Sequence, residues 1–176
     1  MSDIADNMQI PLVETDRLTL RGPTLADFAE SAAMWGDPDV TRHIGGVPFS
    51  EEDVWGRLHR YVGHWVLLGC GMWVVRDKAG TFIGEAGFLE VKRAIVPPLD
   101  APEVGWALSR DAHGKGYATE AVRAALAWGE QHWGSTHFTC MIDPDNAASI
   151  RVAEKCGFRP ATPTSYKGSP TVIFRR

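Results

Sequence analysis

The chain has 176 residues, of which 44% are hydrophobic and 23% are charged, and this length and composition fit one globular domain with a sizeable core. The formal net charge of −4 gives no general attraction to nucleic acid or to anionic membranes, so neither is an expected partner. No apolar run approaches the roughly 20 residues that span a bilayer.

The N-terminus and the cysteines bear on where the protein works. The first residues are polar, without the basic start and apolar run of a secretory signal. Cys70, Cys140 and Cys156 are widely spaced and contain no C-x-x-C pair, which suits a reducing cytoplasm better than a disulfide framework or a zinc cluster. We therefore expect a cytoplasmic protein in which 1–176 form one domain and 1–10 a flexible tail.

Local patterns predict one strand and two helices near the start of the chain. Arg17–Arg21 alternates along its length and predicts a strand. Thr24, with Asp27 three positions later, predicts a helix start. Ser50 followed by three acidic residues predicts the start of a second helix, because acids favour the positive end of the helix dipole. The prolines and glycines of 37–46 predict a loop between them.

The rest of the chain alternates between strands and helices, and no linker divides it. We expect strands at Met72–Arg76 and Thr81–Val91, a loop at Lys92–Ala101, a strand at Glu103–Ser109, a helix at Gly116–Trp133, a strand at Thr136–Ile142, a helix at Asn146–Cys156 and two strands within Phe158–Arg176. The order β-α-α-β-β-β-α-β-α-β-β predicts a mixed sheet with helices on both faces.

The clearest chemical signal is the glycine-rich loop between the 103–109 strand and the 116–133 helix. Its glycines let the backbone approach a ligand without a Cβ atom in the way. The first amides of the helix have no intrahelical partner and lie at the positive end of its dipole. Strand, loop and helix together predict an anion site suited to a pyrophosphate, with Lys115 adding charge. For G-x-G alone, a helix start without any ligand remains the alternative.

Two other phosphate-binding motifs fail on spacing. A dinucleotide fingerprint needs a third glycine where Thr119 stands and an acid about 20 residues later, and neither is present. A P-loop needs G-x-x-x-x-G-K-[ST], which is also absent. A nucleotide-binding oxidoreductase is therefore disfavoured.

Three blocks of the chain resemble the GNAT (Gcn5-related N-acetyltransferase) superfamily. His113-Gly114-Lys115-Gly116-Tyr117-Ala118 is similar to the acetyl-CoA loop Gln/Arg-x-x-Gly-x-Gly/Ala, with His113 in the first place. The segment Asn146–Phe158 resembles the N-x-x-S…K-x-G-F block, and Glu14–Arg21 resembles the start of the ribosomal-protein N-terminal (alanine/serine) acetyltransferases. The blocks occur in the order the family requires and span nearly the whole chain.

The resemblance implies an α+β GNAT fold, with a mixed, mostly antiparallel sheet that opens as a splayed V between the 103–109 and 136–142 strands. Acetyl-CoA would be a co-substrate, its pantetheine arm on backbone near Ala107–Ser109 and its diphosphate on Gly114–Ala118, and no metal is implied. The implied cofactor-binding residues are Ala107, Leu108, Ser109, His113, Gly114, Lys115, Gly116, Tyr117, Ala118, Thr119, Asn146 and Ser149.

Direct transfer is the simpler mechanism, since the sequence has no G-x-S-x-G and no evident nucleophile. Glu103 is the candidate general base and Glu85 the reserve, although either could be a carboxylate that only faces water. The family's usual tyrosine acid falls at Ala153, so Ser149 is the candidate acid or else a packing residue. Tyr166, in the C-terminal hairpin, is a further candidate for a side chain that reaches the cleft.

The leading hypothesis is an acetyl-CoA-dependent N-acetyltransferase acting on a protein N-terminus or a small amine. The alternative is a degenerate acyl-CoA-binding sensor or interaction module, which the alanine at 153 favours. The segment Trp35–Gly71 and the loop Lys92–Ala101 would select the acceptor. The oligomeric state, a homodimer included, stays open.

Overall fold

The computed structural model describes residues 10–176, so the expected tail lies outside the described residues except for Ile10. The strands are β1 (Val13–Glu14), β2 (Leu18–Arg21), β3 (Met72–Asp77), β4 (Phe82–Leu89), β5 (Glu103–Leu108), β6 (Thr139–Ile142), β7 (Arg159–Tyr166) and β8 (Ser169–Arg175). The helices are α1 (Phe28–Trp35), α2 (Pro38–Thr41), α3 (Glu51–Leu68), α4 (Tyr117–Trp133) and α5 (Ala147–Lys155), with short 3-10 turns η1 (Leu25–Asp27) and η2 (Arg110–Ala112).

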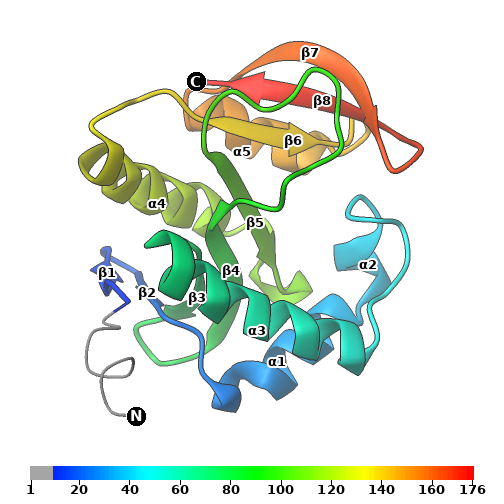
Figure 1. Ribbon diagram of the computed structural model, residues 1–176. Helices are drawn as coiled ribbons and strands as arrows, with labels where there is room; N and C mark the ends of the chain where they lie inside the picture. Colours follow the sequence, from blue (N-terminus) through cyan, green and yellow to red (C-terminus); the bar gives the residue numbers. More distant parts are fainter. Residues whose placement is uncertain (1–9) are drawn as a thin grey trace.

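The eight strands form one sheet in the order β1-β2-β3-β4-β5-β6-β8-β7. Every neighbouring pair is antiparallel except β5 and β6, which are parallel. The expected α+β class, with a mixed and mostly antiparallel sheet, is confirmed. In Figure 1 the arrows of β5 and β6 diverge from a common start, with β7 and β8 beyond β6.

Alternating side chains on the strands pack against different helices on the two faces of the sheet. Val104 and Leu108 of β5 belong to a large core cluster with the apolar side of α4 and part of α5. Ala107, between them, belongs to a second cluster with Met34 and Trp35 of α1 and with Val54 of α3. The prediction of helices on both faces is therefore also confirmed.

The structure corrects the sequence-based elements in a few places. The segment 37–46, expected to be a loop, contains α2, in which Asp37 Oδ1 accepts a hydrogen bond of 2.8 Å from the Asp39 N–H. An Asp N-cap followed by a proline at the first helical position favours a helix start as well as a turn. The two-residue β1 was not expected. β4 ends at Leu89 rather than Val91, and β6 begins at Thr139 rather than Thr136.

A buried carboxylate anchors the first helical segment to the sheet. Asp27 is fully buried and accepts hydrogen bonds from Arg21 Nη2 at 2.5 Å and Arg76 Nη2 at 2.7 Å. It also accepts bonds of 2.8 and 2.9 Å from the Thr24 N–H and hydroxyl. Burial alone raises the pKa of Asp27, but the bonds from Arg21, Arg76 and Thr24 outweigh it and hold that pKa well below its usual range.

We expect Asp27→Asn to lower the free energy of unfolding at pH 7 by about 2 kcal/mol, because the amide leaves two arginines without their charge partner. Asp27 has a depressed pKa in the folded state, so its contribution is complete above the ordinary value of about 3.9 and is lost as pH falls further. Denaturation at several pH values should show the two proteins converging below about pH 4.

Asp53→Asn is the matched control, because Asp53 makes the same kind of capping box with Ser50 at the exposed start of α3. It should cost clearly less than Asp27→Asn does, because Asp53 is fully exposed. Equal losses in the two variants would contradict the role assigned to Asp27.

Candidate functional site

The glycine-rich loop His113–Gly116 connects β5 and η2 to the start of α4. Gly114 and Gly116 have φ angles of +76° and +80°, a conformation that costs little only for glycine. Gly116 is the N-cap of α4 and provides no side-chain cap. Along residues 10–176, the N–H groups of 114–119 have no hydrogen-bond partner. A run of free amides at the positive end of a 17-residue helix has the geometry that favours anion binding.

The expected V between β5 and β6 is present. The two strands share a single residue pair, Glu103 with Thr139, where the Thr139 N–H donates to the Pro102 carbonyl at 3.0 Å. Beyond that pair they separate, with β5 held by β4 and β6 by β8. The V therefore opens toward the end of β5, where the glycine-rich loop begins.

The direction of the β5 backbone decides which of its groups face the V. The Ser109 N–H and hydroxyl both donate to the Ile83 carbonyl, at 3.0 and 3.1 Å, so Ser109 faces β4. Because the pattern alternates in an antiparallel pair, the amide of Ala107 also faces β4, while those of Trp106 and Leu108 face the V. Of the residues expected to offer backbone hydrogen bonds to the pantetheine arm, Leu108 has its amide facing the V, whereas the amides of Ala107 and Ser109 face β4. The Trp106 amide, which also faces the V, was not predicted, although the alternation of a strand could have indicated it.

His113 has a role that its place in the motif did not indicate. Its Nε2 lies 2.9 Å from the Leu108 carbonyl oxygen and ties the loop back to the end of β5. That bond leaves the Leu108 N–H as the group of this residue that is free to meet a ligand. The imidazole therefore shapes the mouth of the V.

Glu103 lies at the narrow end of the V in an ion pair. Arg93 donates to its two carboxylate oxygens from Nε at 2.6 Å and from Nη2 at 2.7 Å. Burial raises the pKa of Glu103 and outweighs the opposing effect of Arg93. A carboxylate has about four acceptor positions, so two remain after Arg93 has bound. The Arg93 guanidinium also lies 4.8 Å from the centre of the Tyr166 ring, which brings Tyr166 to this end of the V.

Glu85, the reserve candidate for the general base, is buried and accepts hydrogen bonds from three side chains. It lies on β4 opposite Ala107 and is 2% exposed. Its carboxylate accepts hydrogen bonds from the Ser31 hydroxyl at 2.8 Å, the Trp35 indole N–H at 3.0 Å and the Tyr61 hydroxyl at 2.9 Å. Burial nevertheless raises its pKa. Proton transfer through Glu85 would require breaking this network.

Asn146 and Ser149 begin α5, just past the open end of β6. The Asn146 side-chain oxygen accepts a 3.0 Å bond from the Ser149 N–H, so Asn146 is the N-cap. The Ser149 hydroxyl has no hydrogen-bond partner in the described part of the chain, and Ala153 is fully buried. Glu103 lies at the other end of β5, roughly 17 Å along the strand. The structure does not bring the two candidate catalytic residues into contact.

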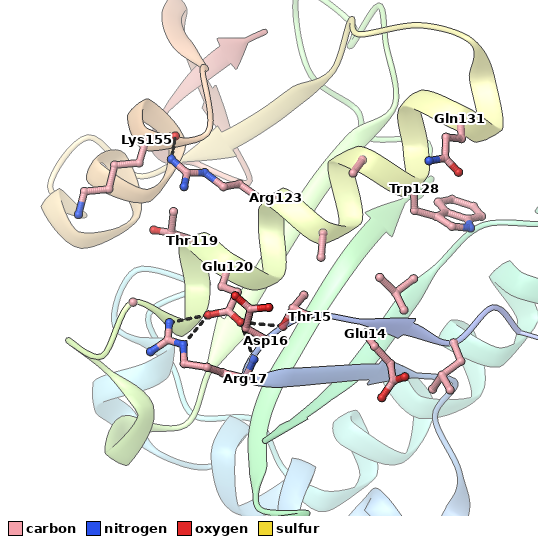
Figure 2. Close-up of a pocket in the computed structure, with 15 residues that line it drawn as sticks. Glu14, Thr15, Asp16, Arg17, Thr119, Glu120, Arg123, Trp128, Gln131 and Lys155 are labelled. Atoms are coloured by element: carbon pink, nitrogen blue, oxygen red, sulfur yellow. Dashed lines mark hydrogen bonds and ion pairs between the residues drawn. The ribbon is translucent and has the colours of Figure 1, made fainter. Parts of the chain in front are cut away.

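A side-chain clamp of Thr15, Arg17 and Glu120 joins the start of the sheet to the loop (Figure 2). Glu120 accepts bonds from the Thr15 hydroxyl and Arg17 Nε, both at 2.6 Å. Arg17 Nη1 donates to the Lys115 carbonyl at 2.9 Å, and its guanidinium lies 4.7 Å from the Tyr117 ring centre. The clamp connects the block Glu14–Arg21 with Lys115 and Tyr117 of the block His113–Ala118, two segments that no spacing rule had linked.

An open groove of about 950 Å³ runs from the loop along α4. Besides Arg17, the cationic residues Arg123 and Lys155 lie at its loop end, where Arg123 Nη2 donates to the Lys155 carbonyl at 2.7 Å (Figure 2). Arg123 lies seven residues after Gly116, on the same face of α4. That helical spacing could have indicated Arg123; the approach of Lys155 depends on how α5 packs.

Within 10–176, no three histidine, cysteine or acidic side chains are grouped so that they could hold a metal ion. No helix in this range has the length and apolar character needed to cross a membrane.

Comparison with known proteins gives consistent matches. The family model described as "Acetyltransferase (GNAT) domain" matches residues 17–159. YkkB, an uncharacterized protein of Bacillus subtilis, is 30% identical over 174 residues, covering 92% of this chain and 93% of YkkB. A Bordetella pertussis structure described as a GNAT-family acetyltransferase is 31% identical with a TM-score of 0.82, covering 94% of this chain and 99% of its own. RimL, a ribosomal L7/L12 α-N-protein acetyltransferase solved with coenzyme A, shares the fold at 16% identity and a TM-score of 0.76, over 94% of this chain and 97% of its own.

We expect Arg17→Ala to loosen the glycine-rich loop without unfolding the protein, because Arg17 is partly exposed and bonds the loop directly. The hydrogen-bonded amides that flank the loop, those of Ala112, His113 and Glu120, should exchange about fivefold faster, as for the loss of roughly 1 kcal/mol of local stability. Arg42→Ala, which removes an exposed ion pair with Asp39, should leave exchange in the loop unchanged. Identical loop exchange in the wild type and Arg17→Ala would show that the clamp does not hold the loop.

Proposed function

The chain belongs to the GNAT family of N-acetyltransferases, and from this premise we propose that it transfers an acetyl group from acetyl-CoA directly to a primary amine. The amine would be a protein N-terminus or a small molecule. The observation that carries the proposal is the adjacency of the free loop amides of 114–119 to the open end of the V. The loop amides can bind an anion, and the V exposes backbone groups to which an extended arm such as pantetheine can bind.

The cofactor would lie along this path from one end to the other. Its diphosphate would accept hydrogen bonds from the amides of Gly114–Thr119, with Lys115 contributing charge. Its pantetheine arm would bind the backbone of Trp106 and Leu108 in the V. A further phosphate would suit Arg123 and Lys155, which border the groove beside the loop.

Transfer needs no covalent intermediate on the protein. The three cysteines are buried, and burial raises the pKa of Cys140, so thiolate attack is disfavoured. In direct transfer Glu103 accepts a proton from the amine, whose nitrogen attacks the thioester carbonyl carbon. The carbon–sulfur bond breaks, and coenzyme A leaves as a thiolate that takes up a proton from water, because Ser149, the candidate acid, is not brought to Glu103 in the structure. Buried free thiols agree with a cytoplasmic location.

The competing function is an acyl-CoA-binding module that no longer transfers, and the alanine at 153 is the observation that favours it. The two functions make the same prediction for cofactor binding and opposite predictions for thiol release. Measuring both on one preparation separates them.

We expect coenzyme A to bind the wild-type protein and to bind Gly116→Ala at least about tenfold more weakly, measured by calorimetry. An alanine at φ +80° is strained, and its Cβ would lie 3.4 Å from Arg17 Nη2. Gly134→Ala is the matched control, because Gly134 has the same left-handed conformation at the other end of α4 and no atom near its missing Cβ. It should lose stability but keep its affinity. Equal affinity in both variants would place the diphosphate elsewhere.

Glu103→Gln should lower kcat by about 100-fold while coenzyme A affinity stays unchanged, because a general base contributes at least this much. Burial raises the Glu103 pKa, so kcat/KM should fall as pH drops through a value above the ordinary 4.3 or so. That acid limb should disappear in the variant. Glu85→Gln should mainly reduce thermal stability. Full activity in Glu103→Gln would exclude Glu103 as the base.

A further inference from the structure

The acceptor has only one face of the sheet from which to reach the thioester. The cofactor site lies at the start of α4, which covers one face together with α5. α1 and α3 cover the other face, onto which Glu85 and Ala107 project. Since the cofactor would fill the V from the α4 side, the amine must approach over the α1 and α3 side. The charges on that side therefore select the acceptor.

Arg57 on α3 is held in place by aromatic rings. Its guanidinium lies 4.0 Å from the Trp35 ring centre and 4.8 Å from that of Phe49, and these two rings are themselves stacked. Its Nη1 donates to the Tyr61 hydroxyl at 3.0 Å, and that hydroxyl in turn donates to Glu85. Arg57 is thus fixed by cation–π contacts and one neutral hydrogen bond, and its charge is not neutralised by an ion pair.

Arg60 lies one turn later on the same side of the helix. Its guanidinium is 6.0 Å from the centre of the Tyr61 ring, and that of Arg57 is 5.9 Å from it. Neither arginine has an ion-pair partner among residues 10–176, whereas Arg93 nearby is paired with Glu103. Four residues further on, His64 is buried, and its Nδ1 has no hydrogen-bond partner in the same range.

The carboxylates on this side are already engaged by other groups. Glu85 accepts three hydrogen bonds, and Glu103 is bound by Arg93 through both oxygens. Burial lowers the pKa of Arg60, the like charges of Arg57 and Arg93 lower it further, and Tyr61 and Glu85 oppose this shift without cancelling it. The two guanidinium groups on the α3 side therefore have no direct ion pair among residues 10–176, and the carboxylates of Glu85 and Asp53 act on them only at a distance.

We propose that Arg57 and Arg60 recognise a carboxylate on the acceptor, so that the substrate class is an amine that also carries an acid group. The inference rests on the proposed transfer to an amine and narrows it. Guanidinium groups match carboxylates in shape and charge. A polyamine would bring further positive charge toward two unpaired cations and is disfavoured on the same ground.

Acceptors matched in everything but charge test the proposal. The C-terminal amides of Ala-Asp-Ala, Ala-Asn-Ala and Ala-Lys-Ala share the same α-amine, and the lysine is trimethylated on its side chain so that it keeps its charge but cannot be acetylated. Free aspartate and spermidine separate a peptide from a small acid and from a polycation. Thiol release from acetyl-CoA gives kcat/KM for each. We expect kcat/KM for each acidic acceptor to be about fivefold or more above that for its neutral or basic counterpart. This preference should weaken as salt is added.

Charge reversal distinguishes recognition from general catalysis. Arg60→Glu should invert the order of the Asp and Lys peptides while leaving coenzyme A affinity unchanged. Arg57→Met, which keeps an apolar contact with Trp35 and Phe49, should lower kcat/KM for the Asp peptide only. Lys78→Glu makes the same charge change at the exposed turn after β3 and should alter no preference.

Three results would overturn the inference. A preference for spermidine or the Lys peptide in the wild type would contradict it, and so would an order of acceptors that Arg60→Glu does not change. Silence with every acceptor, when coenzyme A still binds, would instead remove the proposed transfer and the inference with it. Folding of each variant is checked by its thermal midpoint.

Discussion

The single parallel contact between β5 and β6 is the constraint on which the rest of the site depends. All other neighbours in the sheet are antiparallel and stay paired along their length. β5 and β6 pair only at Glu103 and Thr139. Beyond that pair the two strands separate, while β5 stays paired with β4 and β6 stays paired with β8. Backbone groups of β5 that would normally bind a neighbouring strand are thereby left open to a ligand.

The two sides of this opening differ in the source of their positive charge. On the α4 side it comes from backbone amides at a helix N-terminus, which the clamp of Thr15, Arg17 and Glu120 holds in place. On the α3 side it comes from the side chains of Arg57 and Arg60, placed around the Tyr61 ring. Backbone amides suit a common diphosphate, while side chains can change with the acceptor.

Sequence patterns predicted elements well where the determining interactions are local. The helix starts at Thr24 and Ser50 and the alternating strands were found because each depends on residues a few positions apart. The short α2 was missed because Asp37-Pro38 is compatible with both a turn and a helix start, and packing of Val40 into the second core cluster favours the helix. The free amides of the glycine-rich loop were predictable for the same local reason, because the glycines and the helix start lie in one continuous segment.

The sequence by itself determined the family, the class of fold and the position of the glycine-rich loop, because these depend on contiguous motifs and on short-range periodicity. Only the tertiary structure decided the surroundings of each candidate side chain. Glu103 has Arg93 as a partner, Glu85 is enclosed by Ser31, Trp35 and Tyr61, and Arg17 meets Glu120 across 103 residues. Such contacts join strands and helices far apart in the chain, so their geometry arises only when the sheet and its helices have packed.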